Sequence, residues 1–563
     1  MSTKNNKSGG SIFYKVNSRR GKITTVLIAV VIILVAFTAY TFFIDKTPKE
    51  KLIQAESENM DAIAERWENT WEEWKTLSNL IDTSPYEIDS TVSGSIEDFD
   101  PARFRQELQM VQEVLERGTL NINTAGDPQQ GIMNNSASLT VHGLELLDFE
   151  LNLTEELIAF NCADLYHESL LIETAKLGET LQQTAPRFVL PESIGMPILP
   201  SKENFLELIG KQIKEEYVEF TPDVKHDSPM GEIKVEQLNL SMSPEESENF
   251  FRGLQKSFND KEETQNLIEL LSGMVKVFVM NYTDNENFHS IFSSKENEYL
   301  EGEEQLYFPD GIEMDIFLNE KGEIVDRELS FSLAADPAAE NNALTIDYSS
   351  SNWEPAPHER DTQGELEIKG EENDSALVFD YKWTSASEEE GDKTNLYLKA
   401  RKSQKSNEEN NPTELFSMEI ERIRQTDPET DIDHYETDFD ISFSADRGSL
   451  TAPRVTQNTG ELETGMKGSM VQEINRNMPD TDYAMDNELD LQIYDEYFGW
   501  GEIHLLLNVD IKAQRVEKTT VVKPDEDKAV NLSTIGKDEW KELTSDIRNN
   551  LRDYIDQFRF MLQ

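Results

Sequence analysis

Short segments that alternate between apolar and polar residues fill much of the second half of the chain, and this pattern restricts the fold more than any other feature. At residues 311–334, Ile312, Met314 and Ile316 alternate before a loop that contains Gly322, which predicts a hairpin. Further alternating segments lie at residues 343–349, 364–369, 376–383, 394–401, 415–423, 437–445, 488–494 and 503–512. Because strand side chains point to opposite faces in turn and no helical pattern separates these segments, the sequence predicts an antiparallel meander with one apolar face.

The longest apolar run begins at Ile23, ends at Ile44 and contains 22 residues without a charge. As a helix it would span about 33 Å, which is enough to cross the lipid bilayer. Six cations and no acidic residue precede it, so we expect a cytoplasmic N-terminus and an extracytoplasmic C-terminal domain. A cleaved signal peptide is the alternative, but its apolar region is usually about 7 to 15 residues long. The predicted location is the cell membrane, crossed once.

A long amphipathic helix is expected next to this run. From Met60 to Ile81 the apolar residues recur every three or four positions, and Pro48 and Pro85 suit the start and the end of a helix. We expect this stripe to dock on the outer domain, with a homodimer seam as the alternative. Acidic residues along the same helix disfavour a position flat on an anionic membrane surface.

Two more helices are indicated by their end signals and stripes. Ser243 precedes Pro244 and lies three residues before Glu246, which is a capping-box signature. The end of the chain carries a continuous apolar stripe, which needs a partner. Together the patterns predict an α+β fold, with an N-terminal transmembrane helix followed by an ectodomain in which a large antiparallel meander sheet packs against amphipathic helices.

The expected organisation has six parts. They are a cytoplasmic basic tail (1–22), a transmembrane helix (23–44), a juxtamembrane amphipathic helix (45–85), a mixed α/β extracytoplasmic region (86–300), a β-rich extracytoplasmic region (301–535) and a C-terminal amphipathic helix (536–563).

Acidic residues greatly outnumber basic residues. The chain holds 52 Lys and Arg against 110 Asp and Glu, which gives a net charge of −58. Because binding to nucleic-acid phosphates needs clustered cations, this balance excludes nucleic acid as a partner. Cys162 is the one cysteine, which excludes an intramolecular disulfide and a cysteine-rich zinc module.

The sequence carries no signature of catalysis or of a cofactor. None of the seven histidines has another histidine within five residues, and no nucleophile elbow, phosphate-binding loop or dinucleotide fingerprint occurs. We therefore expect no enzyme activity, no cofactor and no specific metal site. Two acidic clusters are expected only to attract cations, because hard cations favour several oxygen ligands. They are Asp431, Asp433, Asp438 and Asp440, and Asp480, Asp482 and Asp486.

Parts of the chain resemble uncharacterised single-pass envelope proteins of Gram-positive-type bacteria. The similar parts are the tail ending NSRRGK, the apolar run, the segment KEKLIQAESENMDAIAERWENTW and the segment IFLNEKGEIVDRELSFSL. The last of these also resembles hairpins of lipoprotein-carrier-like half-barrels, which hold apolar ligands against a curved sheet. The resemblance implies a curved sheet packed on helices and carries no functional residue over to this chain.

The expected function is that of a membrane-anchored extracytoplasmic protein of binding or structural type. Its acidic ectodomain would engage an envelope component, a protein partner or an apolar ligand, while residues 23–44 contact the lipid bilayer. Two alternatives are a transmembrane sensor or assembly factor that signals through the short basic tail, and an extracytoplasmic hydrolase that uses paired carboxylates.

Overall fold

The computed structural model of the protein describes residues 47–97, 112, 114–154, 156–177, 209–229, 231–259, 307–334, 343–356, 358–370, 375–388, 391–404, 413–427, 432–446, 461–475, 482–495, 501–519 and 529–562. Most of these residues lie in strands. The first strands along the chain are β1 (Tyr86–Glu97), β2 (Gly118–Asp127), β3 (Ile132–Val141), β4 (Leu144–Thr154), β5 (Leu157–Cys162), β6 (Tyr166–Glu173), β7 (Val218–Ser228) and β8 (Gly231–Met242). The others are β9 (Ile312–Leu318), β10 (Ile324–Leu333), β11 (Leu344–Trp353), β12 (Glu359–Gly370), β13 (Ser375–Glu388), β14 (Gly391–Gln404), β15 (Thr413–Asp427), β16 (Ile432–Asp446), β17 (Glu461–Asn475), β18 (Asp482–Asp495), β19 (Gly501–Arg515) and β20 (Ala529–Asn531).

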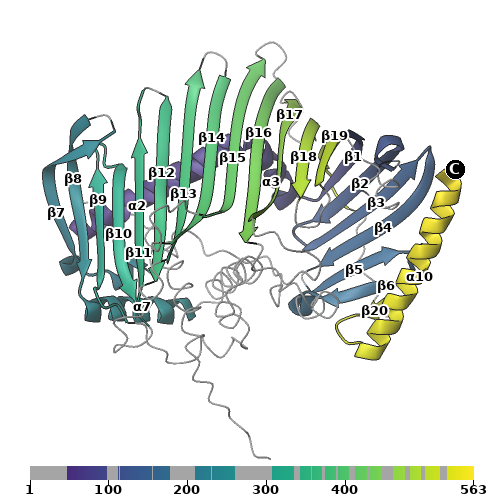
Figure 1. Ribbon diagram of the computed structural model, residues 1–563, viewed down its shortest axis with the longest axis horizontal. Coiled ribbons are helices and arrows are strands. Elements are labelled where there is room, and N and C mark those ends of the chain that lie inside the picture. Colours follow the sequence, from purple (N-terminus) through teal and green to yellow (C-terminus); the bar gives the residue numbers. More distant parts are fainter. Residues whose placement is uncertain are drawn as a thin grey trace, which may run out of the picture.

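All twenty strands belong to one curved sheet (Figure 1). Strands β7 to β19 pair in chain order and antiparallel, as the alternating pattern predicted for the meander. Strand β1 then joins the two parts of the chain, because it pairs with β19 on one side and with β2 on the other. The sheet continues from β2 to β6, where β20 adds a parallel edge strand. The regions predicted at 86–300 and 301–535 therefore share a single sheet.

Helix α7 (Pro244–Asn259) begins at the predicted capping box, where the Ser243 amide donates to a Glu246 carboxylate oxygen at 2.9 Å. Its apolar face reaches the largest core of the described residues. There Phe250 and Leu254 join Met314 and Ile316 of β9 and the facing residues of neighbouring strands. Alternation along β9 and β10 thus places one set of side chains in this core, which is how the predicted hairpin is stabilised.

Helices α2 (Pro48–Thr70) and α3 (Glu72–Thr83) cross the strands on one face of the sheet, and we name residues 48–83 the strap (Figure 1). A helix rises about 1.5 Å per residue and neighbouring strands lie about 4.8 Å apart, so about three residues of helix pass each strand. Glu56 meets Arg327 of β10, and Glu73 meets Arg422 of β15. The 17 residue steps from Glu56 to Glu73 span about 26 Å, close to the roughly 24 Å of five strand spacings.

The strap is buried at its ends and open in its middle. Leu52, Ala55 and Glu56 are buried near one end, and Glu73 and Leu80 near the other. From residue 58 to residue 72 no side chain is buried. The predicted stripe therefore docks only in part, because Ile63 and Trp67 are 43% and 52% exposed while two glutamates enter the interface.

Helix α10 (Lys537–Leu562) confirms the expected C-terminal helix and lies beside the β4–β6 end of the sheet (Figure 1). Asn550 donates a side-chain hydrogen bond to the Leu165 carbonyl at 2.9 Å, and the Tyr554 hydroxyl donates to the Leu146 carbonyl. The helix therefore finds its partner at this edge region of the sheet.

The predicted α+β class is wrong, because strands of one sheet dominate the described residues and helices only cross or flank it. Strand β17 had no predicted counterpart, since Gly465 and Gly468 weaken its alternation. The run from Ile23 to Ile44 lies outside the described residues. Among the helices that the structure describes, none combines the length and the apolar character needed to cross a membrane.

The buried pair between Glu56 and Arg327 yields a first prediction. Both side chains are at most 5% exposed, so Arg327→Met leaves a carboxyl group buried without its partner. We expect this variant to lose about 3 kcal/mol of unfolding free energy in urea titrations. Lys75→Ala removes the exposed pair with Glu68, which also lies on the strap, and is the control, with an expected loss below about 1 kcal/mol. Similar losses in both variants would show that the strap is not held by the buried pair.

A second prediction concerns pH. Burial raises the pKa of the Glu56 carboxyl to about 7, although Arg327 acts against this shift. Because this pKa exceeds the unfolded value of 4.5, the folded protein binds the proton more tightly and loses stability as the pH rises between these two values. Glu56→Gln cannot titrate and does not share this loss. We expect the unfolding free energy of the wild type to fall relative to Glu56→Gln by about 3 kcal/mol from about pH 4.5 to about pH 8. A difference independent of pH would contradict the assignment.

Candidate functional site

A pocket of about 510 Å³ lies between the open middle of the strap and strands β12 to β16. It lies where the strap side chains are not buried, so the docked ends of the strap hold the pocket open. The strap contributes Ala62, Glu65, Arg66, Asn69 and Thr70 to its lining. The sheet contributes His358, Arg360, Ser385, Ala386, Ser387, Asp392, Lys393, Thr394, Arg422, Arg424 and Tyr435.

Strand register explains why distant residues meet on the floor of the pocket. Arg360 pairs with Ser385, Ser385 with Thr394, and Thr394 with Arg422, so these residues form one row across four strands. Arg424 lies two residues beyond Arg422 on the same face of β15, because strand side chains alternate with a period of two. The sequence separates these residues widely, and only antiparallel pairing brings them together.

Three sheet arginines on this face are matched by strap glutamates. Arg327 pairs with Glu56, Arg422 with Glu73 at 2.6 Å, and Arg424 with Glu72 at 2.8 Å. The Arg422 guanidinium also stacks over the rings of Trp71 and Tyr435, at 4.6 Å and 4.3 Å from their centroids. Burial raises the pKa of Glu73 and lowers that of Arg422, and each partner opposes the shift of the other.

At Arg360 the strap presents an arginine instead of a glutamate. Arg66 donates to the Thr362 hydroxyl at 2.8 Å and to the carbonyls of Trp383 and Arg360 at 2.6 Å and 3.2 Å. Its guanidinium lies 4.4 Å from the Trp383 ring centroid. Within the described part of the chain its buried Nε has no hydrogen-bond partner, as is also true of the Nε atoms of Arg327, Arg422 and Arg424. These oxygen atoms are neutral, so they hold the side chain in place without balancing its charge.

The two arginines are close enough to repel each other. Burial and then the charge of Arg360 lower the pKa of Arg66 to about 10, while Asp361 acts in the opposite direction. Arg360 donates from Nε to the Asn352 amide oxygen at 2.9 Å. Within the described residues, neither Arg66 nor Arg360 has a carboxylate within 4 Å, unlike Arg327, Arg422 and Arg424 on the same face. Two such guanidiniums beside a pocket form an arrangement suited to a carboxylate or phosphate.

The acidic residues singled out in the sequence do not gather in this pocket. Asp433 is buried, accepts from the Thr426 hydroxyl at 2.6 Å and lies 3.6 Å from Arg424. Asp438 and Asp440 lie exposed on the opposite face of β16, and Asp486 is exposed on β18. Asp431 and Asp480 lie outside the described residues, as does the side chain of Asp482. Among the described residues, no three His, Cys, Asp or Glu side chains are grouped so that they would hold a metal ion.

The described residues also contain no nucleophile paired with a base. The side chains of His226, His434 and His504 contact carboxylates. Ser387, which lines the pocket, donates its hydroxyl to Asp392 at 2.6 Å. Cys162 is buried, and burial raises the pKa of its thiol, which keeps it protonated and unreactive. Nothing in this part of the chain assembles the groups that nucleophilic catalysis needs.

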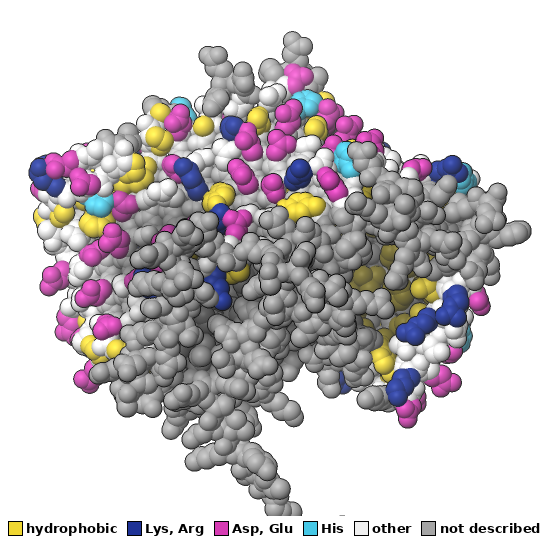
Figure 2. Space-filling view, viewed as in Figure 1, with side chains coloured by type: hydrophobic (Ala, Val, Ile, Leu, Met, Phe, Trp, Pro, Cys, Tyr) yellow, Lys and Arg dark blue, Asp and Glu magenta, His cyan; other side chains and the backbone are white. Residues whose placement is uncertain are grey.

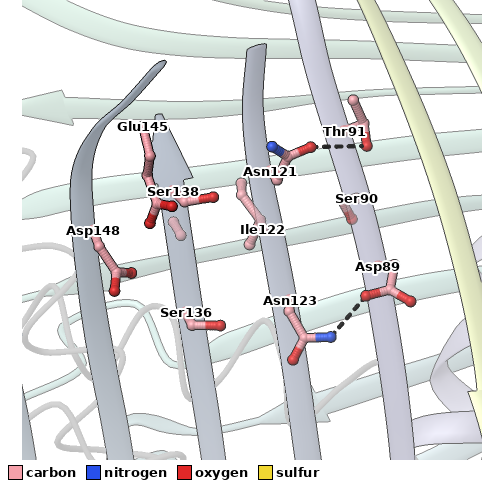
Figure 3. A pocket seen from close by; sticks show the side chains of 11 residues that line it. Asp89, Ser90, Thr91, Asn121, Ile122, Asn123, Ser136, Ser138, Glu145 and Asp148 are labelled. Atoms are coloured by element: carbon pink, nitrogen blue, oxygen red, sulfur yellow. Dashed lines mark hydrogen bonds between the residues drawn. The ribbon is translucent and has the colours of Figure 1, made fainter. Parts of the chain in front are cut away.

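A second hollow, of about 350 Å³, lies over strands β1 to β4 (Figure 3). Asn123 donates to Asp89 at 2.7 Å, and the Thr91 hydroxyl lies 3.5 Å from the Asn121 amide oxygen. Glu145 and Asp148 line the opposite side of the hollow from Asp89 (Figure 3). The carboxylates are therefore separated by uncharged side chains, and this hollow offers an open polar surface instead of a convergent site.

No protein-family model and no curated protein matches the chain. Solved structures that it resembles include a BenF-like porin from Pseudomonas fluorescens Pf-5, at 6% identity and a TM-score of 0.26 over 78% of this chain and 100% of that one. Another is OccK2 (OpdF) of Pseudomonas aeruginosa, at 6% identity and a TM-score of 0.24 over 78% and 99% of the two chains. A third is OmpT, an outer membrane protein of Vibrio cholerae, at 5% identity and a TM-score of 0.13 over 77% and 96%.

These comparisons overturn the expected function. One of these structures is named as a porin and another as an outer membrane protein, unlike the single-pass anchored binding protein, transmembrane sensor or hydrolase that was expected. The expected single-pass location in the cell membrane is wrong on the same findings. The TM-scores are too low for any function of those proteins to be transferred to this chain.

The missing ion pair at Arg360 yields a third prediction. Arg66→Glu would give Arg360 the kind of partner that Arg327, Arg422 and Arg424 have, whereas Arg66→Gln removes the repulsion without adding a partner. We expect Arg66→Glu to be more stable than Arg66→Gln by up to about 1 kcal/mol in urea unfolding. Both variants lose the stacking on Trp383, so their difference reports the charge alone. Lower stability of Arg66→Glu would show that Arg360 is already neutralised.

Proposed function

We propose that this protein binds an anionic ligand between the strap and the sheet, with Arg66 and Arg360 as its principal contacts. The observation that carries the proposal is the pairing of these two cations where the strap elsewhere supplies glutamates. A carboxylate or phosphate in the pocket would relieve their repulsion. His358, Ser385 and Thr394 line the same pocket and add donors beside the two guanidiniums.

The high negative charge of the whole chain does not prevent such binding. Figure 2 shows acidic side chains spread over the described parts of one face, so a dissolved anion is repelled at long range. Salt screens this repulsion over about 10 Å at 0.1 M, whereas partly buried contacts are screened much less. Once the anion has entered the pocket, the two neighbouring guanidiniums dominate its energy. Because the surface charge repels anions at long range, the pocket favours ligands whose anionic group forms direct hydrogen bonds with the guanidiniums.

The proposed function is binding without catalysis. Arginine side chains recognise and orient an anion but do not accept a proton at neutral pH, because they remain protonated. Ser387, the pocket hydroxyl nearest to an acidic group, donates to Asp392, which positions it and supplies no imidazole base. The pocket is therefore equipped to hold a ligand, and among its described lining residues no hydroxyl is hydrogen-bonded to the ring of His358.

Titration calorimetry with inorganic phosphate, at an ionic strength held constant with sodium chloride, tests the proposal. We expect saturable binding to the wild type, and a loss of about tenfold or more in affinity for Arg66→Gln and for Arg360→Gln, because each removes a charge-assisted contact. Arg401→Gln is the matched control, since Arg401 lies on the opposite face of the sheet in pairs with Asp380 and Glu365. It should leave the affinity unchanged.

Two results would contradict the proposal. One is heat of phosphate addition that does not exceed the chloride background. The other is an equal loss of affinity in Arg401→Gln, which would show that phosphate responds to net charge and not to the pocket.

A further inference from the structure

An apolar surface adjoins the pocket on the same face of the sheet. Moving along the strands away from Arg360, the next row across the sheet is Thr362, Trp383, Leu396, Ile420 and Phe439. The row after it contains Tyr381, Leu398, Met418, Ile441, Met466 and Ile493. A third row brings Leu366, Phe379, Ala400, Phe416 and Phe443. We name the partly exposed apolar residues of these rows the apolar band: Leu396, Ile420 and Phe439 in the first row, Leu398, Met418, Ile441, Met466 and Ile493 in the second, and Phe379, Phe416 and Phe443 in the third.

The apolar band is not part of a packed core of the described residues. Leu396, Ile420, Leu398, Met418 and Ile441 are partly exposed, and none of them belongs to the three apolar clusters that the described side chains form. Met466 in the same row is 37% exposed. The strap packs instead near the ends of the strands, where Leu77, Leu80 and Ile81 contact residues such as Tyr435 and Tyr483. Partly exposed apolar side chains in such number are typical of a surface that binds an apolar group.

At the border between the pocket and the apolar band, aromatic side chains lie beside the charged Arg66 guanidinium. Trp383 stacks under the Arg66 guanidinium and begins the first apolar row. Trp67 of the strap meets Trp383 edge-on, with 6.0 Å between ring centroids, and stays half exposed. Successive rows on one face of a strand lie about 6.6 Å apart, so apolar surface begins within one row of Arg360. A ligand held by Arg66 and Arg360 would therefore touch it.

The geometry points to an anionic amphiphile as the ligand, with its phosphate or carboxylate head between Arg66 and Arg360 and its alkyl tail along the apolar band. This inference rests on the proposed function and specifies the class of its ligand. From the Trp383 row to the Phe379 row the strands advance about 13 Å. An alkyl chain that reaches half-way through the hydrocarbon core of a bilayer is about 15 Å long. Charge complementarity at one end of the band favours this ligand over an uncharged apolar one.

The test compares inorganic phosphate with hexyl, octyl and decyl phosphate, each kept below the concentration at which it forms micelles. If the tail lies on the band, affinity rises with each added methylene by up to about fourfold. Octanol supplies the same tail without the charge, and it should bind far more weakly than octyl phosphate. Arg66→Gln should weaken all the phosphates by a similar factor, because it acts on the head alone.

Variants of the band separate the tail from the head. The double variant Met418→Gln and Met466→Gln keeps side-chain length while making two neighbouring band positions polar. We expect it to flatten the dependence on chain length and to leave the affinity for inorganic phosphate unchanged. Val471→Gln is the control, because Val471 is 40% exposed and lies on the opposite face of the strand that carries Met466. This control should change neither the dependence of affinity on chain length nor the affinity for inorganic phosphate.

The outcomes distinguish this inference from the function on which it rests. Phosphate binding without any gain from the alkyl chain would overturn the amphiphile and leave the anion site standing. A gain that persists unchanged in the double variant would overturn it too, since the tail would then lie elsewhere. Absence of phosphate binding in the wild type would remove the proposed function itself.

Discussion

The match between the rise of a helix and the spacing of strands underlies the arrangement of the site. Because about three helical residues pass each strand, the strap offers one side chain to nearly every strand that it crosses. Buried pairs of Glu56 with Arg327 and Glu73 with Arg422 use this match to fix the helix at two places. Between them the strap is held over the sheet without being packed on it, which leaves room for the pocket.

Burial makes these two contacts specific as well as stabilising. A glutamate buried without an arginine partner loses its solvation and gains nothing in return, so any shift of the strap by one strand is unfavourable. Arg66 also needs an explanation in terms of buried charge. It sits among glutamates on a strap that is matched to arginines, in a chain with 110 acidic residues, and the contacts of its guanidinium are to neutral oxygens. A cation in such a position is best explained by an anion that enters the pocket.

Much of the local structure was predictable from the sequence. The hairpin at β9 and β10, the capping box of α7 and the final helix α10 follow from patterns within about 25 residues. The site was not predictable in this way. Arg360, Ser385, Thr394 and Arg422 carry no motif, and they meet only because four strands pair in one register. Among the acidic residues singled out, Asp433 proved to be buried beside Arg424, which sequence position alone does not reveal.

The sequence by itself determined many of the segments that form strands and helices, although not β17, and which of their side chains share a face, because periods of two and of 3.6 residues are properties of each segment alone. Tertiary structure decided which faces meet. Strand β1 closes against β19 more than 400 residues away, and Arg66 reaches Arg360 from 294 residues away. Such contacts depend on register, strand spacing and the desolvation of a few charged groups, and these exist only once the sheet has formed. The proposed anion site therefore depends on the fold and on no single stretch of the chain.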